Sequence, residues 1–240
     1  MSGTEKSEQE FVANYGLPVA WKRAIILFPI IAFSLFAVAM FLESTQDYAF
    51  ALVEDNNVVD ILTFLPAFAG GVLGIIVAMR ARRLGKEKLV WLFYLLFALG
   101  LIFIGGEETS WGQNLYHYRT PEVFDRWNEQ GEVTIHNLDG LNDRNHFLRL
   151  AFGAGGLIGL LAWKSARFRD LAPPRVLQIW LWLIALKSAL DIYTTPYAAR
   201  LMNAYIVAQL SEVIEMLIAI AGLLYVWLNG RRLQRQTRSD

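Results

Sequence analysis

Long apolar runs separated by short polar segments dominate the chain. Each run is close to the roughly 20 residues that a helix needs to cross the hydrocarbon core of a bilayer. The amphipathic helices of a soluble protein would interrupt such runs with polar residues every three or four positions. The pattern therefore predicts an all-α fold, a polytopic transmembrane helix bundle. Six spans are expected, at Ala24–Leu42, Ile61–Met79, Leu89–Gly106, Phe147–Trp163, Val176–Tyr193 and Tyr205–Leu228.

The composition agrees with a membrane protein and excludes several other classes. Hydrophobic residues make up 55% of the chain, and the mean hydropathy is +0.35. The formal net charge is zero, so no bulk field attracts nucleic acid. The chain has no cysteine, which excludes disulfides, thiolate metal sites and a cysteine nucleophile. The lipid bilayer is the expected surrounding.

Basic residues gather in four segments outside the predicted spans: before the first, after the second, after the fourth and after the sixth. With six spans, all four segments lie on the same side of the membrane. Segment 43–60 on the other side is acidic and has no basic residue. Because cytoplasmic loops carry the excess of Lys and Arg, both termini are expected in the cytoplasm of a bacterial inner (plasma) membrane. The basic residues are Lys22, Arg23, Arg80, Arg82, Arg83, Lys86, Lys88, Lys164, Arg167, Arg169, Arg175, Arg231, Arg232, Arg235 and Arg238.

The same pattern predicts three parts of the chain. Residues 1–23 form a cytoplasmic N-terminal segment, 24–228 the transmembrane domain with an outer loop at 107–146, and 229–240 a basic cytoplasmic tail. A cleaved signal peptide is the competing interpretation of the first apolar run, because Ala37–Ala39 resembles a cleavage site. The leader is long and acidic and the run continues past that site, which favours a span.

The outer loop is long enough to have structure of its own. Thr120 as a cap, Pro121 as the first helical residue and Gly131 as a stop predict a short helix. Its apolar face is expected to lie on the outer membrane surface. That face holds Val123, Phe124 and Trp127.

The rest of the outer loop holds turn formers and all three histidines of the chain. Residues 132–136 alternate polar and apolar, which predicts a short extended piece, and Asp143 is expected to cap the fourth span. Imidazoles bind zinc, but the spacing of His117, His136 and His146 matches no metal motif. Three unrelated loop histidines are the simpler interpretation, and a divalent metal stays open as a cofactor of unknown identity.

Two adjacent carboxylates stand where the third span ends. Glu107 and Glu108 lie four and three residues before Trp111, a spacing that places side chains together on a helix. Such a pair needs a cation, a shared proton or different exposures. On this reading Glu107, Glu108 and His136 are catalytic, and Trp111 and Gln113 contact substrate. An ordinary solvated helix end is the alternative.

Ionisable residues also lie inside two predicted spans. Lys187 and Asp191 are four apart on one helix face, which predicts either an internal salt bridge or part of a relay. Glu212 and Glu215 lie in the last span, Glu215 close to mid-bilayer. An acid at that depth must face the bundle and be neutral or paired. Lys187 is the expected partner of Glu215, at the floor of an outer site.

The outer loop also carries a motif. The stretch EETSWGQ, followed by TPEVF, NEQGE and HN, resembles a pattern in uncharacterised bacterial inner-membrane proteins, in which E-E-x-S-W-G-Q precedes T-P, N-x-Q-x-E and H-N. The resemblance covers about 30 residues and implies no particular reaction. The matching positions are Glu107, Glu108, Ser110, Trp111, Gly112, Gln113, Thr120, Pro121, Asn128, Gln130, Glu132, His136 and Asn137.

Three functions remain open on the sequence alone. The first is a hydrolase or transferase that acts on a lipid or lipid-linked substrate at the outer membrane face. The second is a proton- or ion-coupled transporter or channel that uses the intramembrane ionisable residues as a relay. The third is a non-catalytic subunit of a membrane complex, and a homo-oligomer is open in each case.

Overall fold

The computed structural model describes residues 3–54, 57–128, 131–135, 138, 144–195 and 203–239. Six helical segments within them are long and apolar enough to cross a membrane, which confirms the predicted helical bundle. The helices are α1 (Gly3–Tyr15), α2 (Val19–Phe41), α3 (Gln46–Val53), α4 (Val58–Arg83), α5 (Lys88–Glu108), α6 (Gln113–Tyr116), α7 (Glu122–Trp127), α8 (Asn145–Gly159), α9 (Gln178–Thr194) and α10 (Ala204–Ser239).

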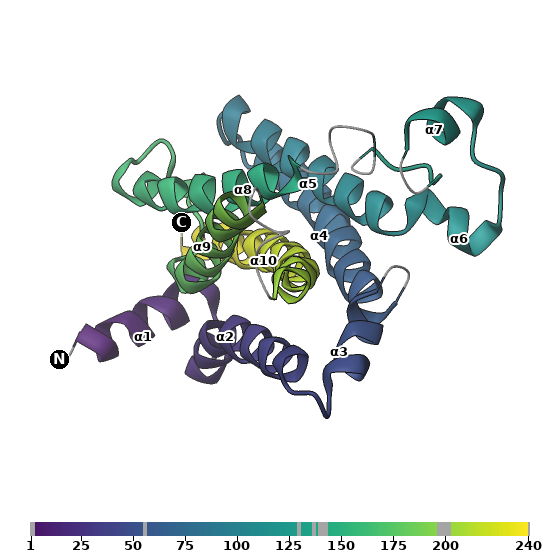
Figure 1. The fold of residues 1–240 in the computed structure, drawn as a ribbon. Coiled ribbons are helices and arrows are strands. Elements are labelled where there is room, and N and C mark those ends of the chain that lie inside the picture. The colour runs from purple at the N-terminus through teal and green to yellow at the C-terminus, as the bar shows by residue number, and fades with distance from the viewer. Residues whose placement is uncertain are drawn as a thin grey trace.

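Helix α10 is the centre of the bundle. Figure 1 shows it between α4 and α5 on one side and α8 and α9 on the other, with α2 closing a third side. Its residues Val213, Ile214, Leu217 and Leu228 are almost completely buried. Lipid tails are as apolar as leucine, so close packing rather than the hydrophobic effect holds such helices together. The last span therefore positions the other five.

The outward faces of the surrounding spans are apolar. Leu27, Ile31 and Leu35 on α2 are exposed, as are Ile61 on α4 and Leu96 on α5. A soluble monomer rarely exposes contiguous apolar patches larger than a few hundred Å². Six apolar spans with apolar outer faces identify an integral, multi-pass membrane protein.

Glycines set the closest approaches between spans. A Cβ built on Gly74 of α4 would lie 2.8 Å from the Cβ of Ala98 on α5. A Cβ on Gly153 of α8 would lie 2.7 Å from the backbone nitrogen of Ala185 on α9. Small residues permit this backbone proximity, so the two helix pairs that flank α10 are built on intramolecular glycine contacts.

The four basic segments meet at one end of the bundle. Arg231 Nε donates to the carbonyl of Tyr15 at 2.7 Å, which joins the end of α10 to α1. Lys86, in the turn after α4, pairs with Asp170 at 2.8 Å. The predicted alternation of loops is therefore present, and the N-terminal segment and basic tail are both helical and packed together.

The outer loop differs from its prediction in three respects. Helix α7 begins at Glu122 and ends at Trp127, and Thr120 donates to the carbonyl of Gly131 at 2.5 Å instead of capping the helix. Residues 131–135 form bends and no strand, because their polar groups bond to side chains of the loop. The predicted cap Asp143 lies outside the described residues.

Candidate functional site

The third span ends abruptly at the two adjacent carboxylates. Ser110 and Trp111 have positive φ angles of 47° and 53°, and Gly112 has a φ of 84°. These left-handed residues stop the helix, and non-glycine residues in that region are uncommon. Because successive helical residues are about 100° apart, Glu107 and Glu108 have different partners, although both line the cavity described below.

Glu107 faces the outer loop and is almost fully buried. One carboxylate oxygen accepts a hydrogen bond from Trp111 Nε1 at 2.7 Å, and the other accepts from the backbone nitrogen of Ile135 at 2.6 Å. The indole ring covers Gly106, where a Cβ would lie 2.8 Å from ring carbons. The expected contact between Glu107 and Trp111 is thus confirmed, and it ties the loop to the end of α5.

Further side chains of the motif hold the loop together. Gln113 accepts from the backbone nitrogen of Val133 at 2.8 Å and donates to Thr120 Oγ1 at 2.6 Å. Asn128 Nδ2 donates to the carbonyl of Thr134 at 2.8 Å, and Ser110 donates to Glu132 at 2.5 Å. Charge-assisted and buried hydrogen bonds of this kind fix the loop, whose described residues include no strand or long helix.

Replacement of Glu107 by glutamine is expected to loosen the outer loop. The amide keeps one acceptor but turns an NH₂ group toward an N–H donor, which costs about 1–3 kcal/mol where the donor is buried. Trypsin cleavage at Arg119 and Arg126 should accelerate about tenfold or more, since local opening controls cleavage. Glu122→Gln is the matched control, because the Glu122 side chain on α7 is 89% exposed. Equal cleavage of wild type and Glu107→Gln would contradict this role.

Glu108 is subject to the charges of carboxyl groups on other helices. These groups are Glu215 and Glu212 on α10 and Asp60 on α4. Arg149 on α8 pairs with Glu215 at 2.5 Å. Buried carboxyl groups that influence one another require a counter-charge or a shared proton. Acidic groups of α4, α5 and α10 therefore influence one another electrostatically.

The predicted pair between Lys187 and Glu215 is wrong. Lys187 Nζ lies 2.5 Å from Asp191 Oδ1 and 2.9 Å from the hydroxyl of Ser211 on α10, and Ser211 donates to the other Asp191 oxygen at 3.1 Å. Asp191 lies one helical turn from Lys187, so Lys187 pairs within its own helix. Glu215 pairs with Arg149 on α8 instead. The alternative of an internal Lys187–Asp191 salt bridge is confirmed.

A cavity of about 200 Å³ opens beside Glu108. Helices α5 and α8 form its walls, with the rings of Phe97 and Phe152 6.5 Å apart between them, and α10 forms its floor. Phe103 on α5 and Leu148 on α8 line the cavity and are exposed on the outer surface of their spans. Apolar side chains on the outside of the bundle therefore border the cavity. The lining residues are Phe103, Ile104, Glu107, Glu108, Asn145, Leu148, Arg149, Phe152, Glu215 and Ile218.

Arg149 is the polar group that the sequence reading missed. Its Nε is buried and has no hydrogen-bond partner within the described part of the chain. The signal was present, because Arg149 is a charged residue within the fourth apolar span, and such residues mark functional sites by default. The cavity thus combines an apolar mouth with a carboxyl group and an available cationic donor.

The histidines do not assemble a metal centre in the described residues. His117 is exposed, whereas His146 is buried with its ring 4.5 Å from that of Phe147. His136 lies outside the described residues. Within the part of the chain that the structure describes, no group of three or more His, Asp or Glu side chains is placed to hold a metal ion.

Comparison with family models, with curated proteins and with solved structures finds no match to this chain. The resemblance of the outer-loop motif to bacterial inner-membrane proteins stays a prediction. Functional inference therefore rests on the geometry of the cavity and on the chemistry of the groups that line it.

Proposed function

We propose that this membrane protein admits a lipid or lipid-linked molecule through the lateral cavity between α5, α8 and α10. The protein acts on the polar part of that molecule as a hydrolase or transferase. The observation that carries the proposal is the cavity itself, with Phe103 and Leu148 at its mouth and Glu108, Arg149 and Glu215 inside. An apolar mouth followed by a few convergent polar groups is the usual form of a ligand site.

The arrangement suits an amphiphile that enters from the bilayer. Hydrocarbon would lie against Phe103, Leu148 and Phe152, which line the cavity. An oxygen of the polar part would accept a hydrogen bond from Arg149 Nε, which has no partner in the described residues. The hydrocarbon chain moves from lipid to an apolar wall, so its entry exposes no apolar surface to water.

Glu108 is the acid–base group of this proposal. Its carboxyl lies inside the cavity and beside Glu215, while Glu107 is committed to the loop by two hydrogen bonds. A positioned carboxyl contributes to catalysis when it transfers a proton to or from the reacting group. The catalytic roles expected for Glu107 and His136 stay predictions.

The excess of basic residues at the opposite end of the bundle supports one orientation. By the positive-inside rule that end and both termini lie in the cytoplasm. The cavity then lies toward the outer face of a bacterial inner membrane, with the loop of 107–146 above it. Substrate would come from the outer leaflet.

A coupled transport function is the second candidate, and a specific observation favours it. Ionisable side chains from α4, α5, α8, α9 and α10 follow one another as electrostatic neighbours, from Asp60 and Glu108 through Glu215 and Arg149 to Lys187. Runs of intramembrane ionisable groups serve as proton relays in pumps and transporters. Proton flux in liposomes separates this candidate from the lipid enzyme.

Leu148→Trp is expected to close the mouth of the cavity. The larger indole fills the space beside Phe103, so labelling of the cavity-lining residues by a photoreactive phospholipid should fall about fivefold or more, because the lipid no longer enters. Ile158→Trp is the matched control, because Ile158 is equally apolar and exposed on α8 and does not line the cavity. Mass spectrometry of peptides locates the label. Undiminished labelling in Leu148→Trp would refute lateral entry.

A further inference from the structure

A second, larger cavity lies at the basic end of the bundle and shares no lining residue with the cavity beside Glu108. Its volume is about 470 Å³, within the range of sites that hold small molecules. Helix α1, the C-terminal part of α10 and the connection between α8 and α9 surround it. The lining residues are Ser7, Glu10, Phe11, Asn14, Tyr15, Lys22, Trp163, Arg169, Arg175, Val176, Arg232 and Gln236.

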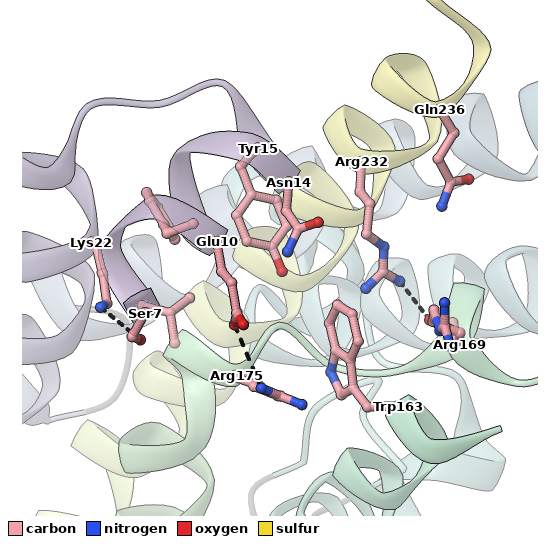
Figure 2. A pocket seen from close by; sticks show the side chains of 12 residues that line it. Ser7, Glu10, Asn14, Tyr15, Lys22, Trp163, Arg169, Arg175, Arg232 and Gln236 are labelled. Carbon is pink, nitrogen blue, oxygen red and sulfur yellow. Dashed lines mark hydrogen bonds and ion pairs between the residues drawn. The ribbon is translucent and has the colours of Figure 1, made fainter. Parts of the chain in front are cut away.

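Positive charge dominates the lining of this cavity. Four of its residues are cationic and one, Glu10, is acidic. Glu10 pairs loosely with Arg175, at 3.6 Å, and the Arg175 side chain is 68% exposed. Figure 2 shows Glu10 and Tyr15 from α1, Arg232 from α10 and Arg175 turned toward a common space. An excess of guanidinium groups around a hollow favours an anionic occupant.

Arg232 gives the second and independent observation. The residue is 3% exposed, and its Nη2 donates to the carbonyl of Arg169 at 2.8 Å. Its Nε and Nη1 are buried and have no hydrogen-bond partner in the described residues. A buried guanidinium with unmet donors is costly, and an anion in the cavity would satisfy it.

The surroundings hold Arg232 in position for such a ligand. Its guanidinium carbon lies 4.5 Å from the centre of the Trp163 ring, and that of Arg175 lies 5.4 Å from the same ring. Burial raises the pKa of Tyr15 to about 12, and the charges of Arg232 and Arg175 oppose that shift, so the Tyr15 hydroxyl lies near the same two arginines. Two arginines on one indole present a fixed pair of planar donors.

We propose that this cavity binds a phosphate group, held by Arg232 and Arg175. Guanidinium groups match the geometry of phosphate oxygens and bind them in pairs. Lys22 and Val176, which line the cavity, belong to the first turns of two spans, so the cavity lies at the level of the bilayer where phospholipid headgroups lie. The phosphate belongs to a lipid headgroup or to a free soluble anion, and the site is independent of the lateral cavity.

The test uses the full chain, purified in detergent, with two probes. Native mass spectrometry measures binding of phosphatidic acid, with phosphatidylcholine for comparison, and thermal unfolding at constant ionic strength measures stabilisation by inorganic phosphate. We expect Arg175→Gln to weaken binding of the effective probe at least tenfold. Binding of phosphatidic acid alone identifies a lipid headgroup, and stabilisation by inorganic phosphate identifies a soluble anion.

Arg167→Gln is the matched control, because Arg167 lies on the same connection, is 63% exposed and does not line the cavity. It should bind as wild type does. Equal weakening by Arg167→Gln and Arg175→Gln would show a diffuse surface attraction and overturn the proposal. Failure of wild type to bind either probe better than Arg175→Gln would also overturn it.

Discussion

Lys187→Met is expected to destabilise the bundle by about 3–5 kcal/mol, the usual cost of a buried ion pair that loses one partner. The side chains of Lys187 and Asp191 are 5% and 8% exposed, so water does not replace the lost charge. Asp191 would keep only the hydroxyl of Ser211 among the partners described above. Equilibrium unfolding in mixed micelles measures the loss.

Adding Asp191→Asn to Lys187→Met is expected to recover most of that stability, because the double variant has no unpaired charge. Lys164→Met is the matched control, since Lys164 is exposed at the end of its span and should change stability by less than about 0.5 kcal/mol. A double-mutant cycle gives the coupling energy. If the two single variants add without coupling, the buried pair does not stabilise the protein.

Glu108→Gln is expected to abolish function and leave the fold intact. The amide has nearly the same size as the carboxyl, and it cannot serve as the proton donor or acceptor of an acid–base step. Loss of such a group typically lowers the rate by 10²–10⁴-fold. The variant should therefore retain substrate that wild type converts. Mass spectrometry of extracts from the two purified proteins should find a lipid or lipid-linked molecule enriched in Glu108→Gln.

Glu107→Gln is the internal comparison for this result, because it changes the adjacent carboxylate in the same way. It is expected to loosen the loop without trapping substrate. Proton flux in liposomes separates the transport candidate: flux in wild type that is absent in Glu108→Gln, without a retained molecule, would favour transport over an enzyme. Two variants with the same behaviour in every assay would show that the structure assigns the two carboxylates incorrectly.

Periodicity and charge predicted much of the fold because the bilayer leaves few choices. A span must be an apolar helix of about 20 residues, so the runs in the sequence located all six. The basic residues also predicted which loops lie together, as the Lys86–Asp170 pair shows. Helix α3 and the packing of α1 against α10 were not predicted, since both depend on tertiary contacts of polar segments.

The candidate site was predicted less well, for a geometric reason. Sequence spacing correctly placed Lys187 and Asp191 together on one helix face. It could not show which way two adjacent side chains turn at a helix end, so Glu107 and Glu108 received one role. The partner of Glu215 was missed because Arg149 and Glu215 belong to different helices whose rotation only the packed bundle fixes.

The most direct test of the lateral cavity is a structure of Glu108→Gln in lipid nanodiscs, determined by electron cryomicroscopy. The account predicts elongated density that enters between Phe103 and Leu148 and ends within hydrogen-bonding distance of Arg149 Nε. Leu148→Trp in the same background should lack that density. A cavity closed by contact between α5 and α8, with no density beside Glu108 in either protein, would contradict the proposal that a lipid reaches this site.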